Sequence, residues 1–192
     1  QARLNTQLAQ VCLPSSGAQA VHPAFLFAIL SMLNARQDGL EVSYGVESLL
    51  ASVAKAAGLP IAALETAAGQ MHALLGDDLR VAPAEYAAAL TLIESGKARS
   101  MTLNMLKAWQ ASDLDYLAQF EQWCECANTP KQRAELQRLL DDRNPALADG
   151  IAKLHQSGSV FAAVGSLHMV GKLGLPLLLK QRGFKVERVK FE

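Results

Sequence analysis

The sequence predicts an α/β fold that is helix-rich overall, with a small, mostly parallel sheet and a large helical insertion. Two short apolar runs at residues 59–64 and 159–164 follow glycines and are typical of buried strands. The closing segment, residues 184–190, alternates like a half-buried edge strand. Residues 67–140 are rich in helix-forming Ala, Leu, Glu, Gln and Met. We therefore expect residues 1–192 to form a single domain in which residues 67–140 are a helical insertion.

Helices are predicted wherever apolar residues recur at helical spacing between breakers. Pro23 suits a first turn, Gly58 is a natural C-cap, and the Ser112-Asp113 pair is typical of a helix start. The expected helices outside the strand segments are residues 23–36, 46–57, 116–126, 141–156 and 173–181. The last of these follows the turn at residues 165–168, so strand, turn, helix and closing strand together predict a βαβ unit.

Composition excludes several classes of protein. Hydrophobic residues make up 51% of the chain and charged residues 19%, which is typical of a globular domain with a core. Eighteen basic and eighteen acidic residues balance without a long run of one sign, which argues against a nucleic-acid surface. No apolar stretch approaches the roughly 20 residues of a transmembrane helix. The first residues lack both an initiator Met and a leader pattern, so we expect the chain to begin inside a larger protein.

The sequence has three cysteines, and it does not decide whether two of them form a disulfide or all three are free thiols. Cys124 and Cys126 flank one glutamate on a predicted helix, where neighbouring side chains point apart. A bridge from Cys12 to one of them is therefore favoured over a bridge within the pair, with three free thiols as the equal alternative. A bridge would indicate an oxidising compartment.

Two predicted strands end next to residues whose side chains could take part in catalysis or metal binding. In open α/β sheets, reactive groups gather beyond the carboxyl ends of the strands, and here those ends deliver Glu65 and His168. A carboxylate and an imidazole in one pocket can bind a divalent metal or act as base and acid. The competing interpretation is structural: a glutamate after a strand is commonly solvated or near a helix cap, and a single histidine is commonly hydrogen-bonded in a core. The sequence lacks a phosphate-binding glycine loop, a Gly-x-Ser-x-Gly elbow and a His-Glu-x-x-His helix.

Several short motifs follow one another in a fixed order along the chain: Tyr44-Gly-Val-Glu-Ser-Leu-Leu50, Leu64-Glu-Thr66, Arg143-Asn144, Phe161-Ala-Ala-Val-Gly165, Gly165-Ser-Leu-His168 and Gly183-Phe-Lys-Val186. This ordered set, over residues 20–190, resembles the TraB/GumN family, which includes the Tiki metalloproteases and is similar to ChaN-like proteins. The resemblance implies a pocket that uses Glu65, Arg143, Asn144 and His168. The family's first Gly-x-x-His and the acidic residue after it have no counterpart, which implies an N-terminally truncated member with an incomplete site.

The resemblance implies a metal-dependent, peptidase-like hydrolase. Its expected catalytic residues are Glu65, Arg143 and Asn144, and its expected ligands for a divalent metal are His168 and Glu65. Arg143 would orient a carboxylate or stabilise developing negative charge. The alternative is a non-catalytic module that binds a peptide or a small molecule. The resemblance also implies export to the periplasm or cell envelope, and the missing first strands predict a homodimer through an exposed sheet edge.

Overall fold

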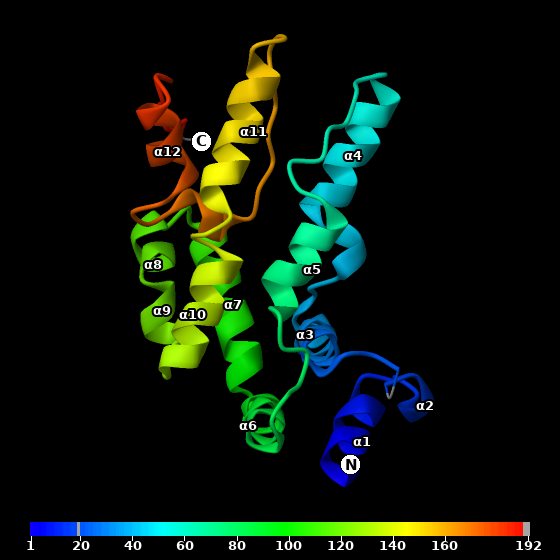
Figure 1. Cartoon of the computed structure of the whole chain (residues 1–192). Helices are drawn as coiled ribbons and strands as arrows, with labels where there is room; N and C mark the ends of the chain where they lie inside the picture. Colours follow the sequence, from blue (N-terminus) through cyan, green and yellow to red (C-terminus); the bar gives the residue numbers. More distant parts are fainter. Residues whose placement is uncertain (19, 190–192) are drawn as a thin grey trace. The chain divides into compact units, whose positions relative to one another are not determined.

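The computed structural model describes residues 1–18 and 20–189, and these residues form helices joined by loops (Figure 1). The α-helices are α1 (Ala2–Gln10), α2 (Ser15–Ala18), α3 (Pro23–Asn34), α4 (Val46–Ala56), α5 (Ala67–Leu75), α6 (Pro83–Glu94), α7 (Lys97–Gln110), α8 (Leu114–Ala118), α9 (Phe120–Trp123), α10 (Pro130–Leu139), α11 (Asn144–His155) and α12 (Leu175–Gln181). The 3₁₀ helices are η1 (Ala35–Asp38), η2 (Val42–Tyr44) and η3 (Ser166–Met169).

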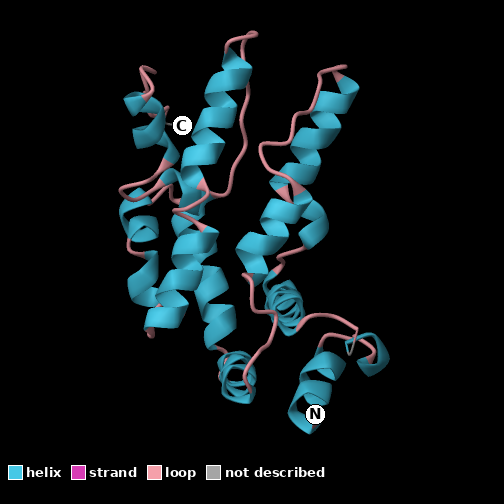
Figure 2. Ribbon diagram, in the orientation of Figure 1, coloured by secondary structure: helices cyan, strands magenta, loops and turns pink. Residues whose placement is uncertain are grey.

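The predicted α/β fold with a parallel sheet is wrong, because no strand occurs in residues 1–18 or 20–189 (Figure 2). Residues 59–64, 159–164 and 184–189 carry neither helix nor ladder, and Lys190 of the predicted closing strand lies outside the described residues. A strand exists only when its backbone groups pair with a neighbour, and no backbone hydrogen bond joins these three segments to one another in the described part of the chain. Most of their side chains are exposed, with Phe161 81% exposed and Ile61 66%, although Leu64 and Val164 are partly buried. The predicted homodimer therefore has no sheet edge to use within the described part of the chain.

The helices predicted at residues 23–36, 46–57, 141–156 and 173–181 are confirmed with small shifts at their ends, whereas the one predicted at 116–126 is two short helices, α8 and α9. The segment expected at residues 23–36 is α3 continued by η1, and α4 ends one residue before the predicted bound. Asp113 caps α8, since its carboxylate accepts the Tyr116 N–H at 2.9 Å. The N-terminal helices α1 and α2 were not predicted. No helix among the residues described has the length and apolar character to cross a membrane.

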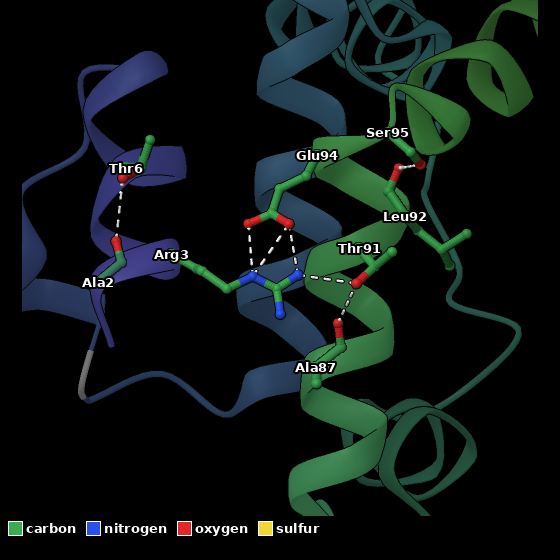
Figure 3. A network of polar contacts seen from close by, with 8 residues as sticks. All are labelled: Ala2, Arg3, Thr6, Ala87, Thr91, Leu92, Glu94 and Ser95. Carbon is green, nitrogen blue, oxygen red and sulfur yellow. Dashed lines mark hydrogen bonds and ion pairs between the residues drawn. The ribbon is translucent and has the colours of Figure 1, made fainter.

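The chain divides into two compact units. The first comprises Gln1–Ile61 and Asp77–Lys107. Its core lies between α1, α3 and α6, and its fully or nearly fully buried leucines and isoleucine are Leu4, Leu8, Leu26, Leu30, Leu90 and Ile93. Figure 3 shows how α1 is tied to α6: the Arg3 guanidinium donates to both carboxylate oxygens of Glu94 and to the Thr91 hydroxyl. The bounds of the two units do not coincide with residues 67–140, so the helical insertion predicted there stays a prediction.

The second unit comprises Ala62–Gly76 and the chain from Ala108 onward. Helices α11 and α12 lie side by side in it (Figure 1), and their core residues are Leu147, Ala148, Leu175 and Leu178. Leu64 packs on this core although it belongs to no strand. Gly150 of α11 permits the approach, since a Cβ there would lie 3.2 Å from Leu64 Cδ2. Because Leu64 packs on this core, the next residue, Glu65, lies close to the beginning of α11, where it bonds Arg143.

The predicted preference for a bridge from Cys12 is wrong. Cys124 and Cys126 form a disulfide with each other, and Cys12 is an exposed free thiol. The predicted helix does not reach these cysteines, because α9 ends at Trp123 and Glu125 has a φ of +53°. This turn brings the two cysteine Cα atoms to 5.0 Å, within the range that a disulfide spans.

Candidate functional site

The four residues predicted for the site meet around the N-terminus of α11. Arg143 is the N-cap residue of this helix and Asn144 is its first residue, with Pro145 favouring the helical start. Glu65 lies directly before α5, whose N-cap Thr66 accepts the Gly69 N–H at 3.0 Å. His168 lies in η3, a helix that packs against α12.

Asn144 joins His168 to the loop before α12. Its side chain is 1% exposed, and its Nδ2 donates to the Leu173 carbonyl at 2.8 Å. That bond sets the orientation of the amide, so Oδ1 is the atom 2.6 Å from His168 Nδ1. Because an amide oxygen only accepts, Nδ1 of His168 carries the proton and donates. Nε2 of the neutral ring is then a lone-pair nitrogen, available to accept a proton or to bind a ligand.

Arg143 and Glu65 form a bidentate ion pair. Arg143 Nε lies 2.8 Å from Glu65 Oε1 and Nη2 lies 2.5 Å from Oε2, and the side chains are 22% and 17% exposed. Arg143 Nη1 also donates to the Leu139 carbonyl at 2.9 Å. These bonds use three of the five guanidinium N–H donors. The guanidinium is therefore fixed in position and retains two donors for a further group.

The electrostatics of the cluster favour an ionised Glu65 and a neutral His168. The Arg143 guanidinium holds the pKa of Glu65 below its ordinary value by hydrogen bonding, against an opposing effect of burial. Burial lowers the pKa of His168, and the positive charge of Arg143 lowers it further, while Glu65 and Asp141 oppose the shift. At neutral pH the imidazole therefore carries no charge and keeps its Nε2 lone pair.

The geometry joins the predicted residues as two pairs, Arg143 with Glu65 and Asn144 with His168. The electrostatic influence of Arg143 and Glu65 on His168 connects the pairs. The backbone carbonyl of Leu173, which fixes the Asn144 amide, was not predicted, because no sequence pattern marks a carbonyl as an acceptor. His155 lies outside the cluster: it is exposed, with its ring centroid 5.3 Å from that of Phe184.

The donor set does not by itself fit a metal ion. No group of three or more His, Cys, Asp or Glu side chains that could hold a metal occurs among the described residues. Both carboxylate oxygens of Glu65 are bonded to Arg143, which leaves His168 Nε2 as the one open ligand of the expected pair. Metal sites in hydrolases commonly use about three protein ligands.

The architecture is that of a helical protein with a His-Asn and Arg-Glu cluster at one helix start. The sequence profile described as the TraB/PrgY/gumN family matches residues 1–188. The chain therefore belongs to the TraB/PrgY/gumN family, which confirms the resemblance derived from the motifs. A comparison with curated proteins found no match, and neither did a comparison with solved structures.

Proposed function

We propose that the chain carries the His168 part of a hydrolase site that acts on peptides. The observation behind this proposal is the state of the imidazole: Asn144 holds Nδ1 as the donor, and burial keeps the ring neutral, so Nε2 is a base. Such a nitrogen can take a proton from an attacking water. The two remaining Arg143 donors can bind the oxygen on which negative charge develops. Membership of the TraB/PrgY/gumN family supports the choice of this cluster.

A divalent metal remains part of the proposal only as an ion that His168 Nε2 would bind. When bound, a metal would activate water and polarise a carbonyl. Glu65 would become a second ligand only by exchanging its bonds to Arg143, and the described residues supply no third. The proton-transfer role of His168 is therefore derived without it.

The experiment combines peptide cleavage with metal analysis. The protein is purified without chelators, its metal content is determined by elemental analysis, and it is incubated with a mixed peptide library read by mass spectrometry. His168→Gln removes the basic nitrogen, and His155→Gln changes an exposed histidine outside the cluster. We expect cleavage that His168→Gln abolishes and His155→Gln retains. Equal cleavage by wild type and His168→Gln, or none by wild type with added Zn²⁺ or Mn²⁺, would refute the hydrolase.

The second candidate is a module that binds peptides or small molecules without reaction. The Arg143–Glu65 pair favours it, because both carboxylate oxygens are already engaged and the guanidinium offers two donors to a ligand carboxylate. This function predicts peptide binding without cleavage in the same library. Arg143→Met would then reduce binding, measured by fluorescence anisotropy, while His168→Gln would leave it unchanged.

We also propose that the protein works in the periplasm or cell envelope. The Cys124–Cys126 disulfide supports this location, since disulfides persist in oxidising compartments. Cell fractionation with an antibody against the chain tests it, and recovery in the cytosol alone would contradict it. A homodimer also stays a prediction: light scattering at high concentration tests it, and a monomer there would remove it.

A further inference from the structure

The Cys-x-Cys disulfide closes around one residue in an unfavourable conformation. Glu125, the residue between the cysteines, has a φ of +53°, in the left-handed region that favours Gly and Asn. A side chain with a Cβ is destabilised there by crowding against the backbone. Reduction of the bridge removes the tie that closes this turn. The oxidised form is therefore disfavoured relative to a bridge between residues in relaxed conformations.

The two sulfur atoms differ in access. Cys124 is 0% exposed, whereas Cys126 is partly exposed. The Cys126 backbone N–H also donates to Cys124 Sγ at 3.1 Å. An incoming thiolate can therefore reach Cys126, while the electron pair that leaves goes to Cys124, where an N–H donor stabilises the thiolate. Attack on an accessible sulfur with a stabilised leaving thiolate is the condition for fast thiol–disulfide exchange.

Contacts other than the bridge hold the structure on both sides of it. Trp123 Nε1 donates to the Tyr116 carbonyl at 3.0 Å, and its ring stacks on that of Tyr116 at 4.7 Å. On the other side, Arg133 Nη1 donates to the Ala127 carbonyl at 2.9 Å, and Thr129 caps α10. A loop of three residues also constrains the unfolded chain less than a longer one. The fold should therefore persist when the bridge is open.

We propose that Cys124–Cys126 is a thiol–disulfide exchange site that accepts electrons from the thiols of other molecules. The thiolate of the incoming molecule attacks Cys126 Sγ, the Cys124–Cys126 bond breaks, and Cys124 Sγ leaves with the electron pair and takes a proton. A second thiolate then attacks the outer sulfur of the mixed disulfide and releases Cys126 as a thiolate. Two thiols are oxidised to one disulfide, and the protein gains two electrons and two protons. None of these residues belongs to the His168 cluster, so the proposal is independent of the proposed hydrolase.

Redox equilibration with glutathione tests the proposal. The background is Cys12→Ser, which removes the free thiol, and Trp109→Phe, which leaves Trp123 as the one tryptophan. The protein is equilibrated at graded ratios of reduced to oxidised glutathione, alkylated and weighed by mass spectrometry. We expect two alkylated cysteines at reducing ratios, none at oxidising ratios, a reversible change in Trp123 fluorescence and an unchanged circular dichroism spectrum. A bridge that stays closed until the protein unfolds, or thiols that stay open in oxidised glutathione, would overturn the proposal.

Single-cysteine variants test the direction of attack. In Cys124→Ala, oxidised glutathione should form a stable mixed disulfide on Cys126, seen as one glutathione adduct. In Cys126→Ala, the buried Cys124 should form this adduct at least tenfold more slowly. Equal rates would contradict the assigned roles.

A change at Glu125 tests the origin of the reactivity. Glu125→Asn places a residue that tolerates the left-handed conformation at this position, which should stabilise the closed bridge. Half-reduction should then require a roughly threefold higher ratio of reduced to oxidised glutathione. Glu121→Asn, on an exposed position of α9, should leave that ratio unchanged. A shift of the ratio in the opposite direction for Glu125→Asn would refute the strain argument.

Discussion

Replacing Asn144 with Ala should destabilise the second unit strongly, because this side chain satisfies two buried groups at once. Its two hydrogen bonds, of 2.8 Å to the Leu173 carbonyl and 2.6 Å to His168 Nδ1, are made by a residue only 1% exposed. Each group left without its partner costs about 1–3 kcal/mol. A small relaxation of the loop recovers part of this, so the expected loss in free energy of unfolding is about 3 kcal/mol. That is a large fraction of the roughly 5–15 kcal/mol that stabilises a typical domain.

Urea unfolding measures this loss, with circular dichroism and tryptophan fluorescence as probes and the midpoint and slope fitted together. The matched control is Asn104→Ala, which removes the same side chain from an exposed position inside α7. Ala is the better helix former, so the control should be neutral or slightly stabilising. A midpoint for Asn144→Ala equal to that of the control would refute the view that this amide holds the site together.

The remaining predictions concern charge, protonation and space in the same cluster. The pKa of His168 is lowered in the folded state, so its contribution to stability is complete above its ordinary value near 6.5 and is lost as the pH falls through the lowered pKa. Urea midpoints should therefore fall between pH 7 and pH 5, and His168→Gln should flatten this dependence; an unchanged slope would contradict the shift. Glu65→Gln leaves the Arg143 charge poorly compensated and should cost about 1–2 kcal/mol at pH 7 by urea unfolding, whereas a loss below about 0.3 kcal/mol would mean that the pair is a solvated contact. Gly174→Ala places a Cβ 2.7 Å from a backbone oxygen of the preceding turn and should lower the thermal midpoint by several degrees, while Gly17→Ala meets nothing within 4 Å and should not; equal midpoints would mean that the turn yields freely.

The helices could be predicted from the sequence because their signals are local. Pro23, Gly58 and Asp113 act within one turn of their own position, and a helix begins or ends within two residues of each of them. A strand differs, since its apolar run is stable only when another segment supplies the ladder. Phe161 shows the consequence: the run that contains it has strand-like composition, yet its side chain is 81% exposed and no described neighbour pairs with it.

The sequence indicated the correct site residues, but the structural element expected to bring them together was wrong. We expected Glu65 and His168 to meet at the carboxyl edge of a sheet, but they are gathered by the start of α11. Asn144 lies 24 residues from His168, and no spacing rule connects an amide to a histidine over that separation. Only the resemblance to the family's motifs indicated that the Arg143-Asn144 pair belongs with them. Local sequence patterns carry no information on contacts between residues so far apart in the chain.

Because Arg143 and Asn144 are adjacent at the start of α11, the carboxylate of Glu65 and the imidazole of His168 are bonded to different side chains. Successive residues at a helix start project in different directions, so Arg143 engages Glu65 while Asn144 engages His168. The N-terminus of α11 carries a partial positive charge, which disfavours a protonated imidazole beside it and acts in the same direction as Arg143. Both effects stabilise the ionised carboxylate and the neutral ring together. Protonation of His168 during a reaction would therefore depend on Glu65 remaining ionised, which makes the Glu65–Arg143 pair a determinant of the basicity of Nε2.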